Sequence, residues 1–171
     1  GYDMFRKDRT DGRIGGGTIL YVKETLKAMA EDTFNVCEFE DMVWCRIVVQ
    51  NQKVLIGLCY RSTSSSAENN RKLLSVLDKA MAQKTTHTTV MGDFNYPTID
   101  YKDGTVDAAD TTDARAFFDK TQDLFMVQYV EEPTRVREGQ QPSVLDYVFA
   151  DEENIIEEME YQEPLGRSDH I

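Results

Sequence analysis

The sequence lacks a long hydrophobic run, a paired cysteine pattern and a surplus of basic residues. Apolar stretches such as Val54–Tyr60 are far shorter than the about 20 apolar residues that a membrane-spanning helix needs. The three cysteines, Cys37, Cys45 and Cys59, are odd in number and contain no CxxC spacing. We therefore expect a soluble, intracellular protein that binds no membrane and has neither disulfides nor a zinc site.

The net charge of −12 argues against a simple polyanion binder, because proteins that bind phosphate backbones normally carry a surplus of lysine and arginine. A site that gathers carboxylates around a divalent cation is also acidic until the ion is counted, so this objection to a nuclease is weakened but not removed. Much of the excess lies in one segment, which we interpret as a solvated face. Its acidic residues are Asp151, Glu152, Glu153, Glu157, Glu158, Glu160 and Glu163.

The length suits one domain with a real core, and residues 1–171 are interpreted as a single domain. β-Branched and aromatic runs predict strands, and apolar residues at helical spacing predict helices. The expected strands cover residues 17–22, 42–49, 53–59, 88–91, 124–130 and 144–150, with another beginning near residue 169, and the expected helices cover residues 67–81 and 114–122. This amount of strand favours an α/β sandwich of two packed mixed sheets with helices outside.

Asp93 and Asn95 follow the strand expected at residues 88–91. Phosphodiester hydrolysis needs a cation to neutralise the phosphoryl oxygens, a group that aligns or deprotonates water, and a donor to the transition state. The carboxylate of Asp93 is suited to accept a proton from a water molecule that the amide of Asn95 orients. The alternative is an Asx-turn, in which both side chains bond the local backbone.

Asp146 and His170 form a second predicted element of the site. Asp146 is an ionisable residue inside the apolar run at residues 144–150, where a buried strand tolerates one only with a partner. If the final strand lies beside this run, Asp146 accepts a hydrogen bond from one ring nitrogen of His170 and leaves the other to face a phosphate. Asp169, which points the other way from His170, is then free to bind a metal ion. His87 is interpreted as structural.

Tyr60 and Arg61 close the strand expected at residues 53–59. A tyrosine hydroxyl and a guanidinium at the end of a strand suit contacts with phosphate. An aromatic residue that caps a core strand is the commoner explanation for a tyrosine taken singly.

Four motifs in chain order resemble those of one known family: YR at 60–61, GDFN at 92–95, LDYVF at 145–149 and SDH at 168–170. They are similar to the apurinic/apyrimidinic-endonuclease-like domain of the endonuclease/exonuclease/phosphatase superfamily. GGGTILYVK at 15–23, MVWCRI at 42–47 and EEPTR at 131–135 resemble the endonuclease domains of non-LTR retrotransposons. The resemblance implies a four-layered, DNase I-like α/β sandwich, incomplete at both ends, and nicking of DNA with Mg²⁺ or Mn²⁺ that supplies a 3′-hydroxyl for reverse transcription.

The resemblance also implies a role for each matching residue. Asp93 and Asn95 handle the nucleophilic water, Asp146 orients His170, His170 contacts the scissile phosphate, Asp169 is the metal-side acid, and Tyr60 contacts phosphate. Arg61, Arg135 and Ser168 are expected to bind the substrate, and the loop Arg135–Ser143 is a candidate for reading DNA. The implied partners are DNA and a covalently linked reverse transcriptase domain, with nuclear localisation when the protein acts on genomic DNA.

One departure from the family pattern concerns the metal site. The family begins with a strand that bears an Asn and continues to a Glu that is the chief metal ligand, and neither is present before Gly1. We therefore expect weak or no cleavage by these residues alone. Two other interpretations stay open: a phosphatase of the same fold that acts on inositol phosphate or phospholipid, and a non-catalytic remnant of a retroelement copy.

Overall fold

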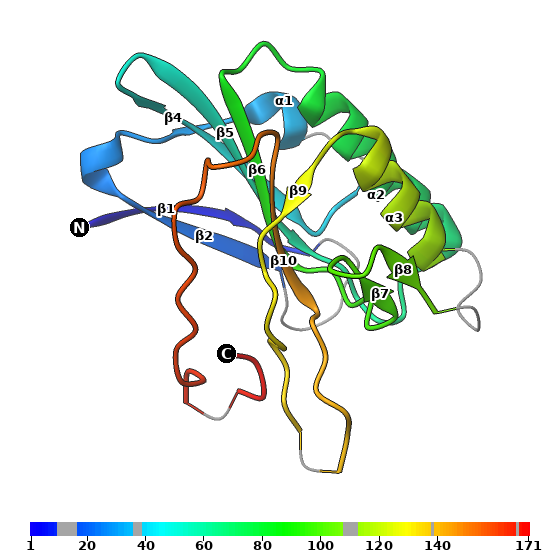
Figure 1. The fold of residues 1–171 in the computed structure, drawn as a ribbon. Helices are drawn as coiled ribbons and strands as arrows, with labels where there is room; N and C mark the ends of the chain where they lie inside the picture. The colour runs from blue at the N-terminus through cyan, green and yellow to red at the C-terminus, as the bar shows by residue number, and fades with distance from the viewer. Residues whose placement is uncertain (10–16, 36–38, 108–112, 138, 167) are drawn as a thin grey trace.

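A six-stranded mixed sheet forms the centre of the computed structural model, which describes residues 1–9, 17–35, 39–107, 113–137, 139–166 and 168–171 (Figure 1). The strand order is β3 (Met29–Ala30), β4 (Met42–Val49), β5 (Gln52–Tyr60), β6 (His87–Asp93), β10 (Asp146–Ala150) and β9 (Val127–Gln128). Strands β5 and β6 are parallel, and the other neighbours are antiparallel. The predicted mixed sheet is therefore confirmed.

Local sequence explains the two connections that build the centre of this sheet. Gln50 and Asn51 join β4 to β5 with positive φ values of 49° and 67°, as a tight two-residue hairpin turn requires. Helix α2 (Ala67–Met81) then carries the chain from β5 to the parallel strand β6. The side chain of Ser66 caps this helix by accepting a hydrogen bond from the Asn69 backbone N–H. The bounds predicted for β4 and α2 are those observed.

Helices and a second sheet cover the two faces of the central sheet. Alternate residues of β4 point to opposite faces, so Trp44 belongs to the core beneath α2 and α3 (Asp113–Asp123), whereas Cys45 and Ile47 pack against Val22. Val22 lies on β2 (Thr18–Lys23), which pairs with β1 (Tyr2–Lys7) in an antiparallel two-stranded sheet. The expected α/β sandwich of two packed sheets with helices outside is confirmed, and in the described residues the second sheet has two strands.

Smaller elements complete the described chain. They are a 3-10 helix η1 (Glu24–Leu26), helix α1 (Asp32–Asn35), and the short hairpin of β7 (Ile99–Asp100) and β8 (Thr105–Val106). These elements and β3 were not predicted, because two-residue strands and single helical turns leave no periodic pattern in the sequence. The six-residue strand β1 was also missed, because its sequence YDMFRK does not alternate strictly between apolar and polar residues.

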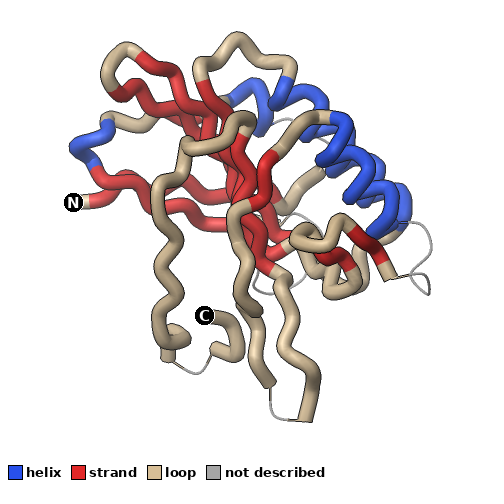
Figure 2. Tube along the Cα trace, viewed as in Figure 1, coloured by secondary structure: helices blue, strands red, loops and turns tan. Residues whose placement is uncertain are grey.

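Two predicted strands were wrong in extent. Residues 124–130 form only the short edge strand β9. Phe125 adopts a left-handed conformation (φ 55°), so the residues just after α3 belong to the end of that helix and not to a strand. The segment near residue 169 forms an isolated bridge between His170 and Arg135 and does not pair with β10. The segments on both sides of that bridge are loops in Figure 2.

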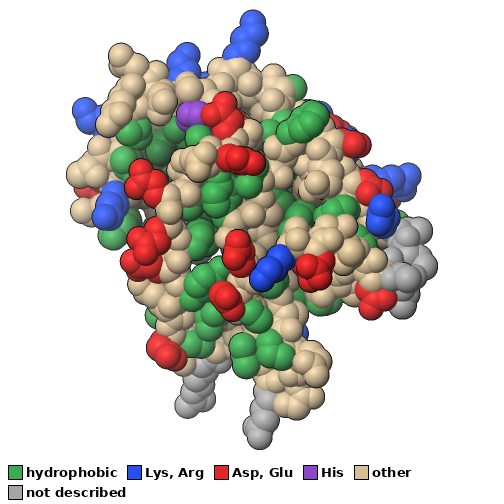
Figure 3. All heavy atoms as spheres, in the orientation of Figure 1, with side chains coloured by type: hydrophobic (Ala, Val, Ile, Leu, Met, Phe, Trp, Pro, Cys, Tyr) green, Lys and Arg blue, Asp and Glu red, His purple; other side chains and the backbone are tan. Residues whose placement is uncertain are grey.

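The cysteines, the hydrophobicity of the helices and the acidic segment can be compared with what the sequence predicts. Cys45 and Cys59 are buried free thiols, and burial raises the pKa of Cys45 to about 11; Cys37, Gly15 and Gly16 lie outside the described residues. Within the described chain, no helix has the length and hydrophobicity needed to cross a membrane. The glutamates of the acidic segment are exposed, as expected, and Figure 3 shows acidic side chains spread over one face of the molecule.

Candidate active site

The site lies where β5, β6 and β10 end or begin beside one another. Asp93, the last residue of β6, is level with Tyr60 of β5 on one side and with Asp146 of β10 on the other. Gly92 makes this junction possible, because its φ is 130° and a Cβ there would lie 2.0 Å from the backbone oxygen of Cys59. The GDFN motif therefore needs its glycine for close strand approach.

Asp93 and Asn95 are held by both local and distant contacts. A carboxylate oxygen of Asp93 accepts a hydrogen bond from the Asn95 backbone N–H at 3.1 Å, which is the local bond that the Asx-turn interpretation requires. The Asn95 amide donates to the backbone oxygen of Arg61 at 2.8 Å, and Asn95 adopts a left-handed φ of 52°. Both side chains are thus fixed in orientation, and their convergence on one water molecule stays a prediction.

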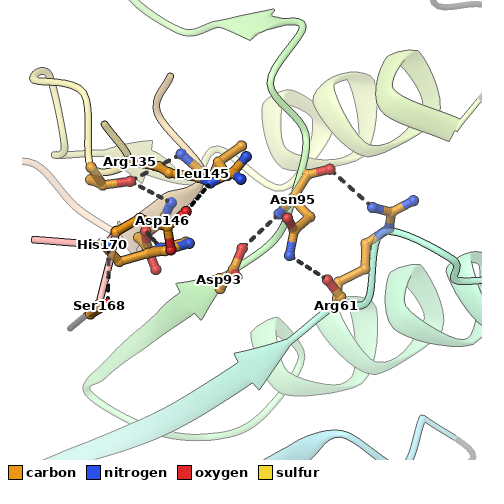
Figure 4. Close-up of polar contacts among 10 residues, drawn as sticks. Arg61, Asp93, Asn95, Arg135, Leu145, Asp146, Ser168 and His170 are labelled. Atoms are coloured by element: carbon orange, nitrogen blue, oxygen red, sulfur yellow. Dashed lines mark hydrogen bonds and ion pairs between the residues drawn. The ribbon is translucent and has the colours of Figure 1, made fainter. Parts of the chain in front are cut away.

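Asp146 and His170 form the predicted pair. The Asp146 carboxylate oxygen Oδ2 lies 2.8 Å from His170 Nδ1, although the two residues are not on adjacent strands. Figure 4 shows this pair on one side of Asp93 and the contacts of Asn95 with Arg61 on the other. In the described residues the hydrogen bond of the His170 ring is made by Nδ1, which is the arrangement of a histidine oriented by a carboxylate.

Thr134 holds both members of this pair in place. Its hydroxyl oxygen accepts hydrogen bonds from the backbone N–H groups of Leu145 and Asp146, each at 3.1 Å. Its backbone oxygen accepts from the Ile171 N–H at 2.9 Å, next to His170. Thr134 is only 4% exposed, so these bonds are shielded from water. Thr134 lies in the EEPTR motif at 131–135, but it was not predicted to be a site residue.

Replacing Thr134 with valine is expected to lower the free energy of unfolding by about 2 kcal/mol, because two buried N–H groups lose their acceptor. It should also slow any reaction that uses the Asp146–His170 pair. Denaturant unfolding measures the first effect. Thr88→Val, at the far end of β6, is the matched control, because Thr88 is equally buried and its hydroxyl also makes a hydrogen bond. If both variants lower activity equally, Thr134 has no special link to the site.

The electrostatics of the site favour a bound cation. Asp93, Asp146 and His170 each offer a ligand atom, and these atoms lie within 4.8 Å of one another. Burial raises the pKa of Asp93 to about 6, and the nearby charge of Asp146 adds to the shift. The two carboxylates repel each other when both are ionised. A divalent cation bound to them would neutralise both negative charges. This group could therefore hold a metal ion.

Asp169 is not part of that group in the described residues. Its carboxylate accepts a hydrogen bond from Arg135 Nε at 3.0 Å, and this contact holds its pKa below the ordinary value. The hydroxyl of Ser168 accepts from the His170 backbone N–H at 3.0 Å. The metal role of Asp169 and the substrate roles of Arg135 and Ser168 stay predictions, and the structure shows that all three residues surround His170.

The interpretation of Arg61 as a phosphate-binding residue needs correction. Arg61 is 6% exposed, and its guanidinium donates to the backbone oxygens of Phe94 and Asn95 while lying 3.9 Å from the ring centre of Tyr96. A side chain enclosed in this way holds the Asp93–Asn95 loop and does not reach a substrate. Tyr60 is partly exposed beside Asp93, and its phosphate contact stays a prediction.

The model of the endonuclease–reverse transcriptase family matches residues 54–171, which include every candidate site residue. The chain belongs to the endonuclease–reverse transcriptase family. Membership confirms the superfamily expected from the GDFN, LDYVF and SDH motifs, and family and fold together support a nuclease or phosphodiesterase activity. No curated protein matches the sequence.

Solved structures share the fold of this family member. The endonuclease domain of TRAS1, a telomere-specific non-LTR retrotransposon, aligns with a TM-score of 0.71 and 16% identity over 99% of this chain and 75% of that one. An endonuclease/exonuclease/phosphatase family protein from Leptotrichia buccalis C-1013-b has a TM-score of 0.54 and 14% identity, over 89% and 60% of the two chains. The inositol polyphosphate 5-phosphatase domain of SpSynaptojanin has a TM-score of 0.51 and 14% identity, over 99% and 61%. The DNase I-like α/β class is thereby confirmed.

Proposed function

We propose that the chain is the DNA-nicking endonuclease domain of a non-LTR retroelement and that it hydrolyses phosphodiester bonds with a divalent metal ion. The observation that carries this proposal is the Asp146–His170 pair at 2.8 Å, with its ligand atoms within 4.8 Å of the Asp93 carboxylate. A proton acceptor for water and an oriented donor for phosphate then lie in one group of side chains, as phosphoryl transfer requires.

The chain's own residues would divide the chemistry between them. The ionised Asp93 carboxylate accepts a proton from the attacking water, whose position Asn95 helps to fix. Asp146 holds the imidazole through Nδ1, so that the other ring nitrogen, Nε2, faces a phosphate oxygen. Asp93 and Asp146 would hold Mg²⁺ or Mn²⁺, with Asp169 as a further candidate, and the ion would supply neutralisation of the phosphoryl oxygens.

The segment from Arg135 to Ser143 is the candidate DNA contact. Its ends pair with each other across an isolated antiparallel bridge, so its described residues form a hairpin-like projection beside His170. This segment holds two arginines, Arg135 and Arg137, against one acidic residue, Glu138, on an otherwise acidic protein, and Arg135 is paired with Asp169. DNA would therefore approach along the projection, in a nucleus if genomic DNA is the target, and a linked reverse transcriptase would extend the nicked strand.

Nicking of supercoiled plasmid under single-turnover conditions, with excess protein so that weak activity is measured, tests the proposal. We expect slow Mg²⁺- or Mn²⁺-dependent conversion to open circles whose nicks carry a 3′-hydroxyl that a polymerase extends, and no conversion in EDTA. A parallel assay measures phosphate release from inositol polyphosphates, because the SpSynaptojanin domain shares the fold. Phosphate release without nicking would replace the endonuclease by a phosphatase, and failure of both reactions with metal present would leave a non-catalytic remnant.

A further inference from the structure

Arg61 contacts the Asp93–Asn95 loop through its backbone as well as its side chain. The backbone N–H of Arg61 donates to the Asp93 backbone oxygen at 2.8 Å, and its backbone oxygen accepts from the Asn95 side-chain amide at 2.8 Å. Its guanidinium Nη1 donates to the backbone oxygens of Phe94 and Asn95 at 3.3 and 3.1 Å. These bonds hold the loop on both sides of the left-handed residue Asn95.

A second pair of residues holds the guanidinium itself. Arg61 Nε donates to the side-chain oxygen of Asn70 at 2.9 Å, and the Asn70 amide donates to the Asp113 carboxylate at 2.7 Å. Asn70 is 4% exposed on α2, and Asp113 begins α3. The contacts therefore run from the first turn of α3 through α2 to the loop after β6. In the described part of the chain, the side-chain hydrogen bonds of Asn70 run to Arg61 and Asp113, and its link to the loop passes through Arg61.

This arrangement is specific to the two side chains that form it. A guanidinium is planar and presents several donors in fixed directions, so one side chain reaches Asn70 and two loop carbonyls at once. Asn70 is matched to it, because an amide accepts with its oxygen and donates with its nitrogen, as this position requires. A buried polar residue with both functions used is costly to replace by an apolar one.

We propose that Asn70 and Arg61 are positioning residues of the active site, which fix the Asp93–Asn95 loop for reaction although neither touches the substrate. The inference rests on the proposed endonuclease function. It assigns a role to α2, and through Asp113 to α3, in setting the geometry of the reacting groups. Loss of the Asn70 contacts should lower the rate of the chemical step and leave DNA affinity unchanged, because the loop would be displaced while the DNA-binding projection stays intact.

The decisive variant is Asn70→Leu, which keeps the size of the side chain and removes both hydrogen bonds. We expect its single-turnover nicking rate at saturating DNA to fall by about 10- to 100-fold, with the Kd for DNA changed by less than about threefold. Asn69→Leu is the matched control on the same helix, because the Asn69 amide bonds Ser65 and not the loop network. The double variant N70D/D113N reverses the donor and acceptor between the two positions, keeps both hydrogen bonds and should restore the rate to within about threefold of the wild type.

Two-dimensional NMR of the metal-free protein supplies a readout that needs no activity. In Asn70→Leu, the side-chain amide signals of Asn95 should shift or broaden, and in Asn69→Leu they should stay in place. A wild-type rate in Asn70→Leu, or a swap variant that folds yet stays as slow as Asn70→Leu, overturns the inference. If the wild type cleaves no DNA, the proposed function fails, and unchanged Asn95 signals in Asn70→Leu would then be what overturns the positioning role.

Discussion

Replacing His170 with alanine is expected to slow DNA nicking by about 10³-fold. The imidazole is held 2.8 Å from the Asp146 carboxylate, so its orientation is set before substrate binds. Alanine removes the donor that we propose for the phosphate and leaves the projection formed by the segment from Arg135 to Ser143 in place. Single-turnover plasmid nicking measures the rate, and a filter-binding titration should show DNA affinity within about threefold of the wild type.

Asp146 should behave as one unit with His170. Asp146→Asn is expected to cost about 10²- to 10⁴-fold in rate, because an amide N–H facing Nδ1 stabilises the wrong tautomer of the ring. The double variant should be no slower than the slower single variant, since each change already disables the pair. The matched control is the same pair of substitutions at His87 and Asp151. These residues form a second His–Asp pair, 3.7 Å apart, at the other end of β6. Nicking by His170→Ala within about tenfold of the wild type would contradict this assignment.

Sequence reasoning found the core of the site because the relevant signals are local. An ionisable residue inside the apolar run VLDYVFA requires a partner, and the structure supplies His170. GDFN follows a strand and contains a glycine, which predicts side chains presented at a strand end. Strand β4 and helix α2 are long and strongly patterned, and their bounds were predicted correctly.

The remaining errors concern burial and long-range pairing, which periodicity does not encode. Arg61 looked like a surface cation at a strand end, but residues from α2 and the loop after β6 enclose it. No role was predicted for Asn70, which is buried where α2 contacts Asp113 of α3. Thr134 has a role only because three distant backbone groups meet at it. Each of these roles depends on tertiary contacts between segments far apart in sequence.

Asp93→Asn is expected to abolish nicking while it stabilises the metal-free protein at neutral pH. Burial, with the charge of Asp146, raises the pKa of Asp93 to about 6, whereas an unfolded chain ionises near the ordinary pKa of about 4. Between these values the folded protein binds the proton more tightly than the unfolded chain, so this group makes stability fall as pH rises from about 4 to 6. Above that range the charged carboxylate destabilises the fold by about 1 to 2 kcal/mol, after allowance for its partial exposure.

Urea unfolding in EDTA at several pH values between 4 and 8 measures this effect. Asp93→Asn should be more stable than the wild type by about 1 to 2 kcal/mol at pH 8, and the difference should vanish near pH 4, where a protonated Asp93 is as neutral as the amide. Asp103→Asn, in the exposed turn between β7 and β8, is the control, because that carboxylate is exposed and lies outside the group of Asp93, Asp146 and His170.

Added metal should make the wild type more stable than Asp93→Asn, which reverses their order in the metal-free state. A cation that binds only the folded protein stabilises it in proportion to its affinity, so millimolar Mg²⁺ or Mn²⁺ at pH 8 should raise the unfolding free energy of the wild type. Asp93→Asn should gain less, because it keeps one carboxylate of the pair that offers ligand atoms. Two results would contradict this prediction: a metal-free Asp93→Asn that is less stable than the wild type at pH 8, or an Asp93→Asn whose unfolding free energy rises as much with metal as that of the wild type. Either result would show that the charge of Asp93 is not the source of the destabilisation that a bound cation removes.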